Sequence, residues 1–236
     1  LDEYQKFIYA SRYSRWNEKE QRREFWGETV KRYLDFFETH LKKKNNYTLP
    51  ARLRKQLEKA ISNLEIMPSM RCLMTAGEAL KRDNVAGYNC SFLNIDNPKS
   101  FDEAMYILMC GTGVGFSVEK KFVEKLPKVP DEIVESSEII FVDDSKIGWA
   151  TAFRKLISLL YAGRIPRWDV TQIRPKGSPL KTMGGRASGP EPLVELMEFA
   201  IKIFNESKGQ KLSCLQCHDI MCKIGEIVIV GGVRRS

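Results

Sequence analysis

The strongest constraint on the fold is a change of apolar pattern near Pro68. Before it, apolar side chains recur at the spacing of helix faces, first as Phe25, Val30, Tyr33, Leu34, Phe36 and Phe37, then as Leu53, Leu57 and Ile61. After it, glycines separate short segments, a pattern typical of strands and tight turns. The sequence therefore predicts a helical region over 1–66 and an α/β region over 67–236.

Within the second region the pattern predicts strand, helix, glycine turn and strand. We expect a strand at 89–93 and a helix at 101–109, followed by glycines at 111, 113 and 115. Further amphipathic spacing predicts helices at 148–161 and 192–204. The apolar run 226–230 is typical of a buried strand, whose sheet would need further partners.

Composition excludes several classes of protein. No apolar run reaches the roughly 18 to 20 residues of a membrane helix, and the polar residues 1–6 do not form a secretory leader, so we expect a cytoplasmic protein without membrane contact. Most of the +8 formal charge lies in the first sixty residues, but acidic side chains interrupt it as on a solvated helix, so we expect no nucleic-acid binding. The six cysteines favour thiol chemistry or simple burial over disulfides.

Four segments have residue types that could carry chemistry, each with an ordinary alternative. The C-x-x-C-H of 214–218 fits haem attachment or half a zinc site, but His40 is the only other histidine, so a packed helix face is favoured and no metal site is expected. The glycines of 111–115 suit a close phosphate or a simple turn. The loop 174–190 has four basic residues that suit an anion or a solvated surface. Cys90 is either an inert core thiol or a redox-active one.

Nine segments, in order, resemble one known family. They are YQKFI (4–8), SRYSRW (11–16), MPSMR (67–71), TAG (75–77), YNCSF (88–92), MCGTGVGF (109–116), KTMGGRASGP (181–190), CHDIMC (217–222) and GGVRRS (231–236). In this order and spacing the chain closely resembles the N-terminal part of a class II, adenosylcobalamin-dependent ribonucleotide reductase of the monomeric ribonucleoside-triphosphate type.

The resemblance implies a fold and a reaction. The fold would be the helical layer plus the first half of a ten-stranded α/β barrel, with an inserted effector-site subdomain at about 127–176. The reaction would convert ribonucleoside triphosphates to 2′-deoxyribonucleotides by radical chemistry. A cobalamin-derived radical generates a cysteine thiyl, and two further cysteines reduce the 2′ carbon and become a disulfide.

The resemblance also implies roles for individual residues. Cys90 would be the first of the two reducing cysteines. Ser69, Asn89 and Gly113 would contact the substrate, with Gly113 offering its backbone. Residues 114–125 would form a specificity loop for a deoxynucleotide effector. The loop residues we expect to act there are Val114, Gly115, Phe116 and Lys120.

The chain departs from the family pattern at the radical site. No cysteine is followed two residues later by glutamate, as the family's Asn-x-Cys-x-Glu motif requires. We therefore expect a partner, a C-terminal reductase fragment that carries the radical cysteine and most of the adenosylcobalamin surface, through a split gene, an intein or a truncation. A thioredoxin-like reductant would restore the dithiol. The alternative is a non-catalytic binding module that senses deoxynucleotides.

Overall fold

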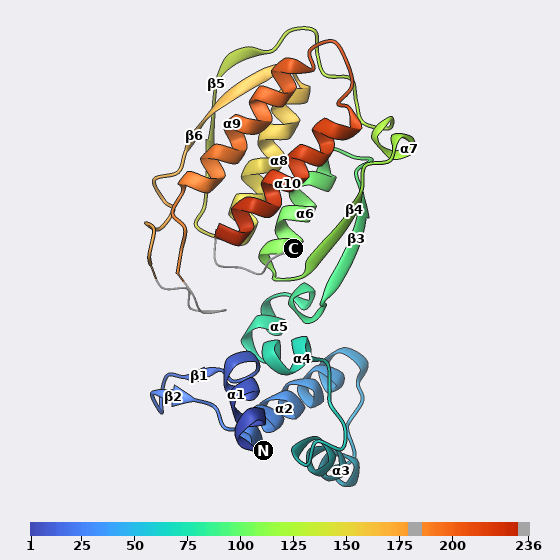
Figure 1. Cartoon of the computed structure of the whole chain (residues 1–236), viewed down its shortest axis with the longest axis vertical. Helices are drawn as coiled ribbons and strands as arrows, with labels where there is room; N and C mark the ends of the chain where they lie inside the picture. Colours follow the sequence, from blue (N-terminus) through green and yellow to red (C-terminus); the bar gives the residue numbers. More distant parts are fainter. Residues whose placement is uncertain (179–185, 231–236) are drawn as a thin grey trace. The chain divides into compact units, whose positions relative to one another are not determined.

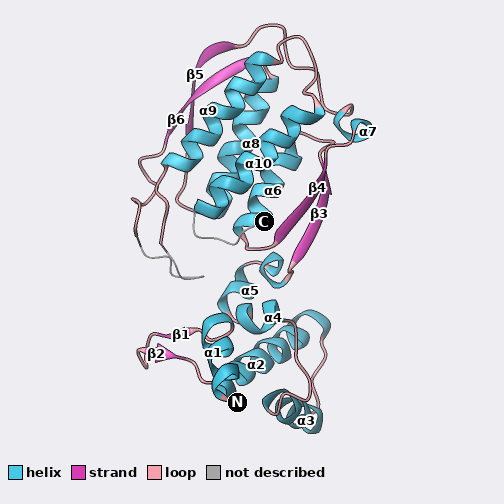
Figure 2. Cartoon of the chain, in the orientation of Figure 1, coloured by secondary structure: helices cyan, strands magenta, loops and turns pink. Residues whose placement is uncertain are grey.

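The computed structural model describes residues 1–178 and 186–230 and divides the chain into two compact units, Leu1–Tyr88 and Asn89–Ser236. The chain is mixed α/β with far more helix than strand (Figures 1 and 2). Residues 67–88, expected in the second region, lie in the first unit. The predicted GGVRRS segment and residues 179–185 of the basic loop lie outside the described residues.

The first unit is helical apart from one small hairpin. Its elements are α1 (Glu3–Arg12), β1 (Trp16–Asn17), β2 (Arg22–Arg23), α2 (Trp26–Asn45), α3 (Ala51–Ser62), α4 (Met70–Thr75), α5 (Glu78–Arg82) and the 3-10 turn η1 (Asn84–Gly87). The helices α1 to α3 lie where the apolar spacing predicts helix. The antiparallel hairpin of β1 and β2 was not predicted, because each strand has only two residues.

Local sequence explains where the main helices of this unit begin and end. Asp2 and Gln5 form a reciprocal capping box at the start of α1. At the start of α2, the Glu28 carboxylate accepts the backbone N–H of Phe25 at 2.7 Å. The helix ends at Asn46, whose φ of +52° is left-handed. Val30, Leu34 and Ile61 then form a buried core between α2 and α3.

The second unit contains two strand–helix–strand crossovers. Its elements are β3 (Cys90–Asn94), α6 (Lys99–Met109), β4 (Gly113–Ser117), α7 (Lys120–Val123), β5 (Val134–Phe141), α8 (Lys146–Tyr161), β6 (Arg164–Asp169), α9 (Glu191–Glu206) and α10 (Cys214–Val230). β3 pairs with β4 and β5 with β6, both in parallel, and α6 and α8 are the crossovers. The predicted strand at 89–93 and the predicted helices are confirmed.

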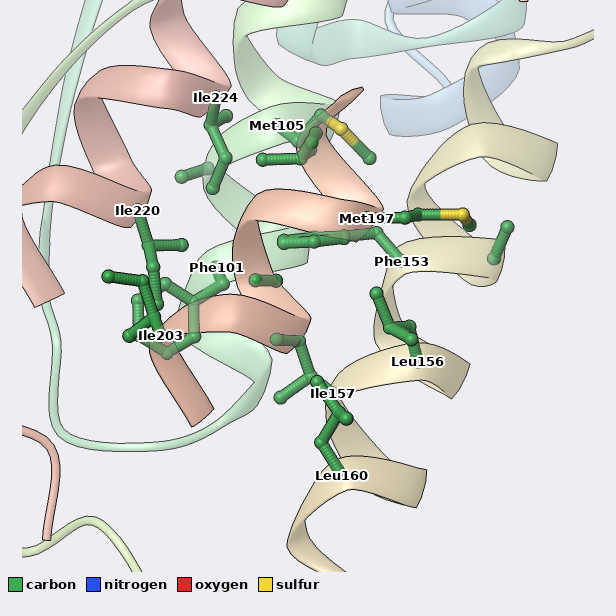
Figure 3. Packing of buried hydrophobic residues seen from close by; sticks show 14 of the residues in the cluster. Phe101, Met105, Phe153, Leu156, Ile157, Leu160, Met197, Ile203, Ile220 and Ile224 are labelled. Carbon is green, nitrogen blue, oxygen red and sulfur yellow. The ribbon is translucent and has the colours of Figure 1, made fainter. Parts of the chain in front are cut away.

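The core of the second unit lies between α6, α8, α9 and α10, which pack side by side (Figure 1). Figure 3 shows the contact between these helices: Phe101 and Met105 come from α6, Phe153 from α8, Met197 from α9 and Ile224 from α10. All five side chains are fully buried. Burial of such side chains stabilises a fold by roughly 1.5 to 3 kcal/mol each, so this cluster holds the crossovers in place.

The predicted strand at 226–230 is wrong, because these residues form the last turns of helix α10. Buried positions in α10 recur at Cys217, Ile220, Ile224 and Ile227, the spacing of one helix face. A short apolar run fits a buried strand and a buried helix equally well, and packing on α6 and α9 decides between them. The expected unpaired strand at this end is therefore also wrong.

Two further strands, β5 and β6, were not predicted. Their residues include three carboxylates, two arginines and one proline, which weaken the apolar alternation typical of strands. Helix α8 connects the two strands in the chain and packs against both of them. It brings the chain back so that β6 runs parallel to β5. No helix in the described residues is long and apolar enough to cross a membrane.

Candidate functional site

Strands β3 and β4 bring three of the predicted site residues together. Cys90 is paired with Gly113 at the start of the parallel ladder. The Gly113 N–H donates to the Asn89 carbonyl at 3.0 Å, and the Ser91 hydroxyl donates to the Gly113 carbonyl at 3.0 Å. Residues separated by more than twenty positions in the sequence therefore share one end of the strand pair.

The Cys90 thiol is exposed and has a polar neighbour. The Asn89 side-chain amide donates to the Cys90 sulfur at 3.3 Å. All six cysteines are free, and only Cys90 and Cys222 are exposed. Cys217, by contrast, lies in the core, where burial raises the pKa of its thiol to about 12 and keeps it protonated. Cys90 is therefore an accessible thiol and not a core thiol.

Gly113 leaves the surface beside Cys90 without a side chain. A Cβ at Gly113 would lie 3.6 Å from the Asn89 carbonyl oxygen, an ordinary contact, so packing within the chain does not require glycine there. The backbone of Gly113 is half-buried and lies in strand geometry. Because Gly113 has no side chain, a ligand can approach both its backbone and the exposed Cys90 thiol closely.

The predicted specificity loop is in large part not a loop. Val114, Gly115 and Phe116 lie in β4, where ladder hydrogen bonds to β3 fix their backbone. Val114 and Phe116 pack partly against the core, and the Phe116 ring lies 6.0 Å from the His218 imidazole. Lys120 is in the helical turn α7, exposed, with Glu124 at 3.6 Å. The glycines of this segment looked like a turn, but pairing with β3 makes them strand.

Ser69 lies in the first unit, directly before α4. It is exposed, and its hydroxyl makes no capping hydrogen bond to that helix. The far end of α4 is held by arginine: Arg32 donates to the carbonyls of Leu73 at 3.0 Å and Ala76 at 2.7 Å. Ser69 therefore presents an exposed hydroxyl, without a hydrogen bond to the described residues, from a helix that is anchored at its other end.

The C-x-x-C-H segment forms the first turns of α10. Its Cys217 is buried, whereas His218 is exposed and its Nε2 lies 3.6 Å from the Cys222 sulfur. In the described parts of the chain, no three His, Cys, Asp or Glu residues are grouped to hold a metal ion.

Two family models match separate parts of the chain. Residues 1–78 match the ribonucleotide reductase alpha domain, and residues 124–204 match the insertion domain of B12-dependent ribonucleotide reductase. The second match begins near the predicted insertion at 127–176 but extends to residue 204, within α9.

Curated relatives and a solved structure match nearly the whole chain. Adenosylcobalamin-dependent ribonucleoside-triphosphate reductases from Lactobacillus gasseri and Lacticaseibacillus paracasei are 29% and 31% identical over 97% of it. The crystal structure of a B12-dependent class II ribonucleotide reductase is 25% identical, with a TM-score of 0.85, again over 97%. The chain spans about 40% of the length of these proteins.

Proposed function

We propose, on the premise that this chain carries the N-terminal region of a class II, adenosylcobalamin-dependent ribonucleotide reductase, that it supplies one reducing thiol and part of the nucleotide-binding surface of such an enzyme. The observation that carries the proposal is the exposed Cys90 thiol beside the bare backbone of Gly113. The rest of the enzyme, including the radical cysteine, would come from the C-terminal part of the protein or from a separate chain.

In this proposal Cys90 acts with a second cysteine from the remaining part of the enzyme. The two thiols provide two electrons and two protons. The 2′ C–O bond of the ribose breaks, a C–H bond forms in its place, and the hydroxyl leaves as water while the thiols become a disulfide. A thioredoxin-like dithiol then reduces that disulfide. Adenosylcobalamin, when bound, supplies the radical that starts the reaction.

The neighbours of Cys90 support this role. The Asn89 amide donates to the sulfur, which orients the thiol. Gly113 leaves space for a ribose. On the family resemblance alone, we further propose that the exposed Ser69 hydroxyl of the first unit binds a phosphate oxygen of a ribonucleoside triphosphate. We also propose a deoxynucleotide effector near the end of β4 and α7, where Lys120 is an exposed cation.

The architecture fits an incomplete barrel. The parallel pair of β3 and β4, crossed over by α6, is the kind of unit from which α/β barrels are built. We propose that these strands belong to the first half of the family's ten-stranded barrel and that the C-terminal partner adds the other strands. A cytoplasmic setting agrees with six free cysteines.

The test compares two exposed cysteines in the complete reductase, assembled with adenosylcobalamin, a ribonucleoside triphosphate and a dithiol. Cys90→Ser should lower deoxynucleotide formation by about 100-fold or more, because the disulfide cannot form. Cys222→Ser, the matched control, should leave it within about twofold. The readout is the yield of deoxynucleotide per enzyme.

Full activity in the Cys90→Ser enzyme would remove Cys90 from the reaction. If that variant also bound deoxynucleotide normally, the chain would be a regulatory binding module instead. Quantified disulfide after a single turnover gives a second readout, since Cys90 should appear oxidised only when product has formed.

A further inference from the structure

The first unit contains a second candidate site, a pocket of about 440 Å³ between the β1–β2 hairpin, α2 and the turn before α5. Residues that line it include Arg15, Trp16, Lys19, Glu24, Arg32 and Gly77. Its volume lies within the range of small-molecule sites in proteins. All of its lining residues belong to the first unit, so the pocket is complete without any other part of the chain.

Arg15 is the residue that makes this pocket unusual. Its Nε donates to the Met74 carbonyl at 2.5 Å, and no carboxylate in the described residues lies within ion-pair distance of its guanidinium. Burial and the neighbouring Arg32 lower the pKa of the Arg15 guanidinium more than the carboxylates of Glu24 and Glu78 raise it. A partly buried cation without a direct ion pair is costly, and proteins normally pair such charges.

The other charges in the pocket are already compensated. Arg32 and Glu24 form a two-pronged pair with N–O distances of 2.8 and 2.9 Å, and both side chains are largely buried. Glu78 pairs with Lys81 at 2.8 Å. Arg15, Lys19 and Glu18 are therefore the lining residues without an ion pair to the described residues, while the formal charges of the whole lining, three positive and three negative, cancel.

Trp16 gives the pocket a flat apolar wall. Its side chain is 52% exposed although it follows Arg15 directly and starts strand β1. The indole N–H has no hydrogen-bond partner among the described residues. A half-exposed indole can stack on a planar base, and a neighbouring guanidinium can donate two hydrogen bonds to a phosphate.

From these observations we propose that the pocket binds a nucleoside monophosphate. Arg15 binds the phosphate through the guanidinium nitrogens that face away from Met74, and Trp16 stacks on the base. Arg15 is one guanidinium fork, and the carboxylates of Glu18, Glu24 and Glu78 also line the pocket, so the site suits one phosphate group better than three. This site lies outside β3 and β4 and does not depend on the proposed reductase function.

The experiment titrates the full chain with adenosine 5′-monophosphate by calorimetry, with inorganic phosphate, adenosine and adenosine 5′-triphosphate as comparison ligands. The monophosphate should bind at least about tenfold more tightly than either phosphate or adenosine. It should also bind more tightly than the triphosphate. Weaker binding of the monophosphate than of the triphosphate, or binding equal to that of phosphate alone, would overturn the assignment.

Variants identify the pocket as the place of binding. Arg15→Gln should weaken monophosphate binding by about tenfold or more, whereas Arg52→Gln removes the same charge from an exposed position on α3 and should change nothing. Because Arg15 also anchors Met74, its variant is checked by thermal unfolding. If it does not fold, Trp16→Ala decides, since Trp16 is exposed: it should weaken binding about fivefold. Unchanged affinity in either folded variant refutes the site.

Discussion

Two tyrosines, Tyr9 and Tyr161, differ in whether their buried hydroxyl stabilises or destabilises the fold. The Tyr9 hydroxyl lies 2.6 Å from the Glu24 carbonyl and 2.8 Å from the Thr29 hydroxyl, so it is fully hydrogen-bonded. The Tyr161 hydroxyl is buried with no hydrogen-bond partner in the described residues, and burial raises its pKa well above the ordinary value. Its ring still packs on Phe204, edge to face.

We therefore expect opposite effects from the same substitution. Tyr9→Phe should lower the free energy of unfolding by about 1 to 2 kcal/mol, because two hydrogen bonds are lost and Thr29 loses a partner. Tyr161→Phe should leave it unchanged or raise it by up to about 1 kcal/mol, because an unpaired hydroxyl is removed and the ring remains. Urea unfolding of both variants measures the difference. A larger loss in the Tyr161 variant would show that its hydroxyl has a partner, such as an ordered water.

At the scale of elements, one ion pair joins the crossover helices α6 and α8. Arg154 donates to the Asp102 carboxylate at 2.7 to 2.8 Å. Asp102 is almost wholly buried, and this burial raises its pKa more than Arg154 lowers it. Arg154 remains partly in water, where the carboxylate raises the pKa of the guanidinium. The charged form of Asp102 is therefore tolerated in the fold mainly because Arg154 is present.

Arg154→Gln should destabilise the protein in a pH-dependent way. A carboxyl whose pKa is raised in the folded state binds its proton more tightly there than in the unfolded state. Its contribution to the free energy of unfolding is therefore present at low pH and is lost as the pH rises through the folded pKa. Without Arg154 that pKa rises further. We expect a loss of about 2 kcal/mol near pH 7, allowing for the partial exposure of Arg154, and a smaller loss near pH 4.

Chemical unfolding at the two pH values measures this dependence. The double variant Arg154→Gln with Asp102→Asn is the control and should lose the pH dependence, since the titrating carboxyl is gone. Equal losses at both pH values in the single variant would mean that Asp102 does not titrate in this range.

At the scale of the whole molecule, the chain has separate hydrophobic cores in its two units. Val30, Leu34 and Ile61 form a cluster in the first unit, while the large cluster of α6, α8, α9 and α10 belongs to the second. Compact units with their own cores commonly unfold as separate cooperative steps. The units should therefore respond independently to core substitutions.

Calorimetry of two core variants tests this independence. Phe153→Ala should cost the second unit about 3 to 5 kcal/mol and lower its transition by roughly 10 °C, while the transition of the first unit stays in place. Leu34→Ala should have the converse effect. If both transitions shift together in either variant, the chain unfolds as one cooperative unit.

The sequence alone located several helices of this protein. The helices α2, α3, α6, α8 and α9 follow directly from apolar spacing, because each buries one face and the spacing records that face. The order of short motifs also indicated a resemblance to class II ribonucleotide reductases, which the comparisons confirm. This resemblance singled out Cys90 as a candidate reducing cysteine. These features are local: each depends on residues that are close together in the chain.

Only the tertiary structure decided which segments meet. The run 226–230 is apolar enough for strand or helix, and contact with α6 and α9 makes it helix. The glycines near 113 became strand through pairing with β3, which also placed Gly113 beside Cys90. Arg15 looked like one charge on a solvated surface, but the fold brings it to the Met74 carbonyl, with no ion pair to a carboxylate in the described residues. The spacing of apolar residues indicates which side of a helix or strand is buried. Which other element covers that side depends on packing between segments that are far apart in the sequence.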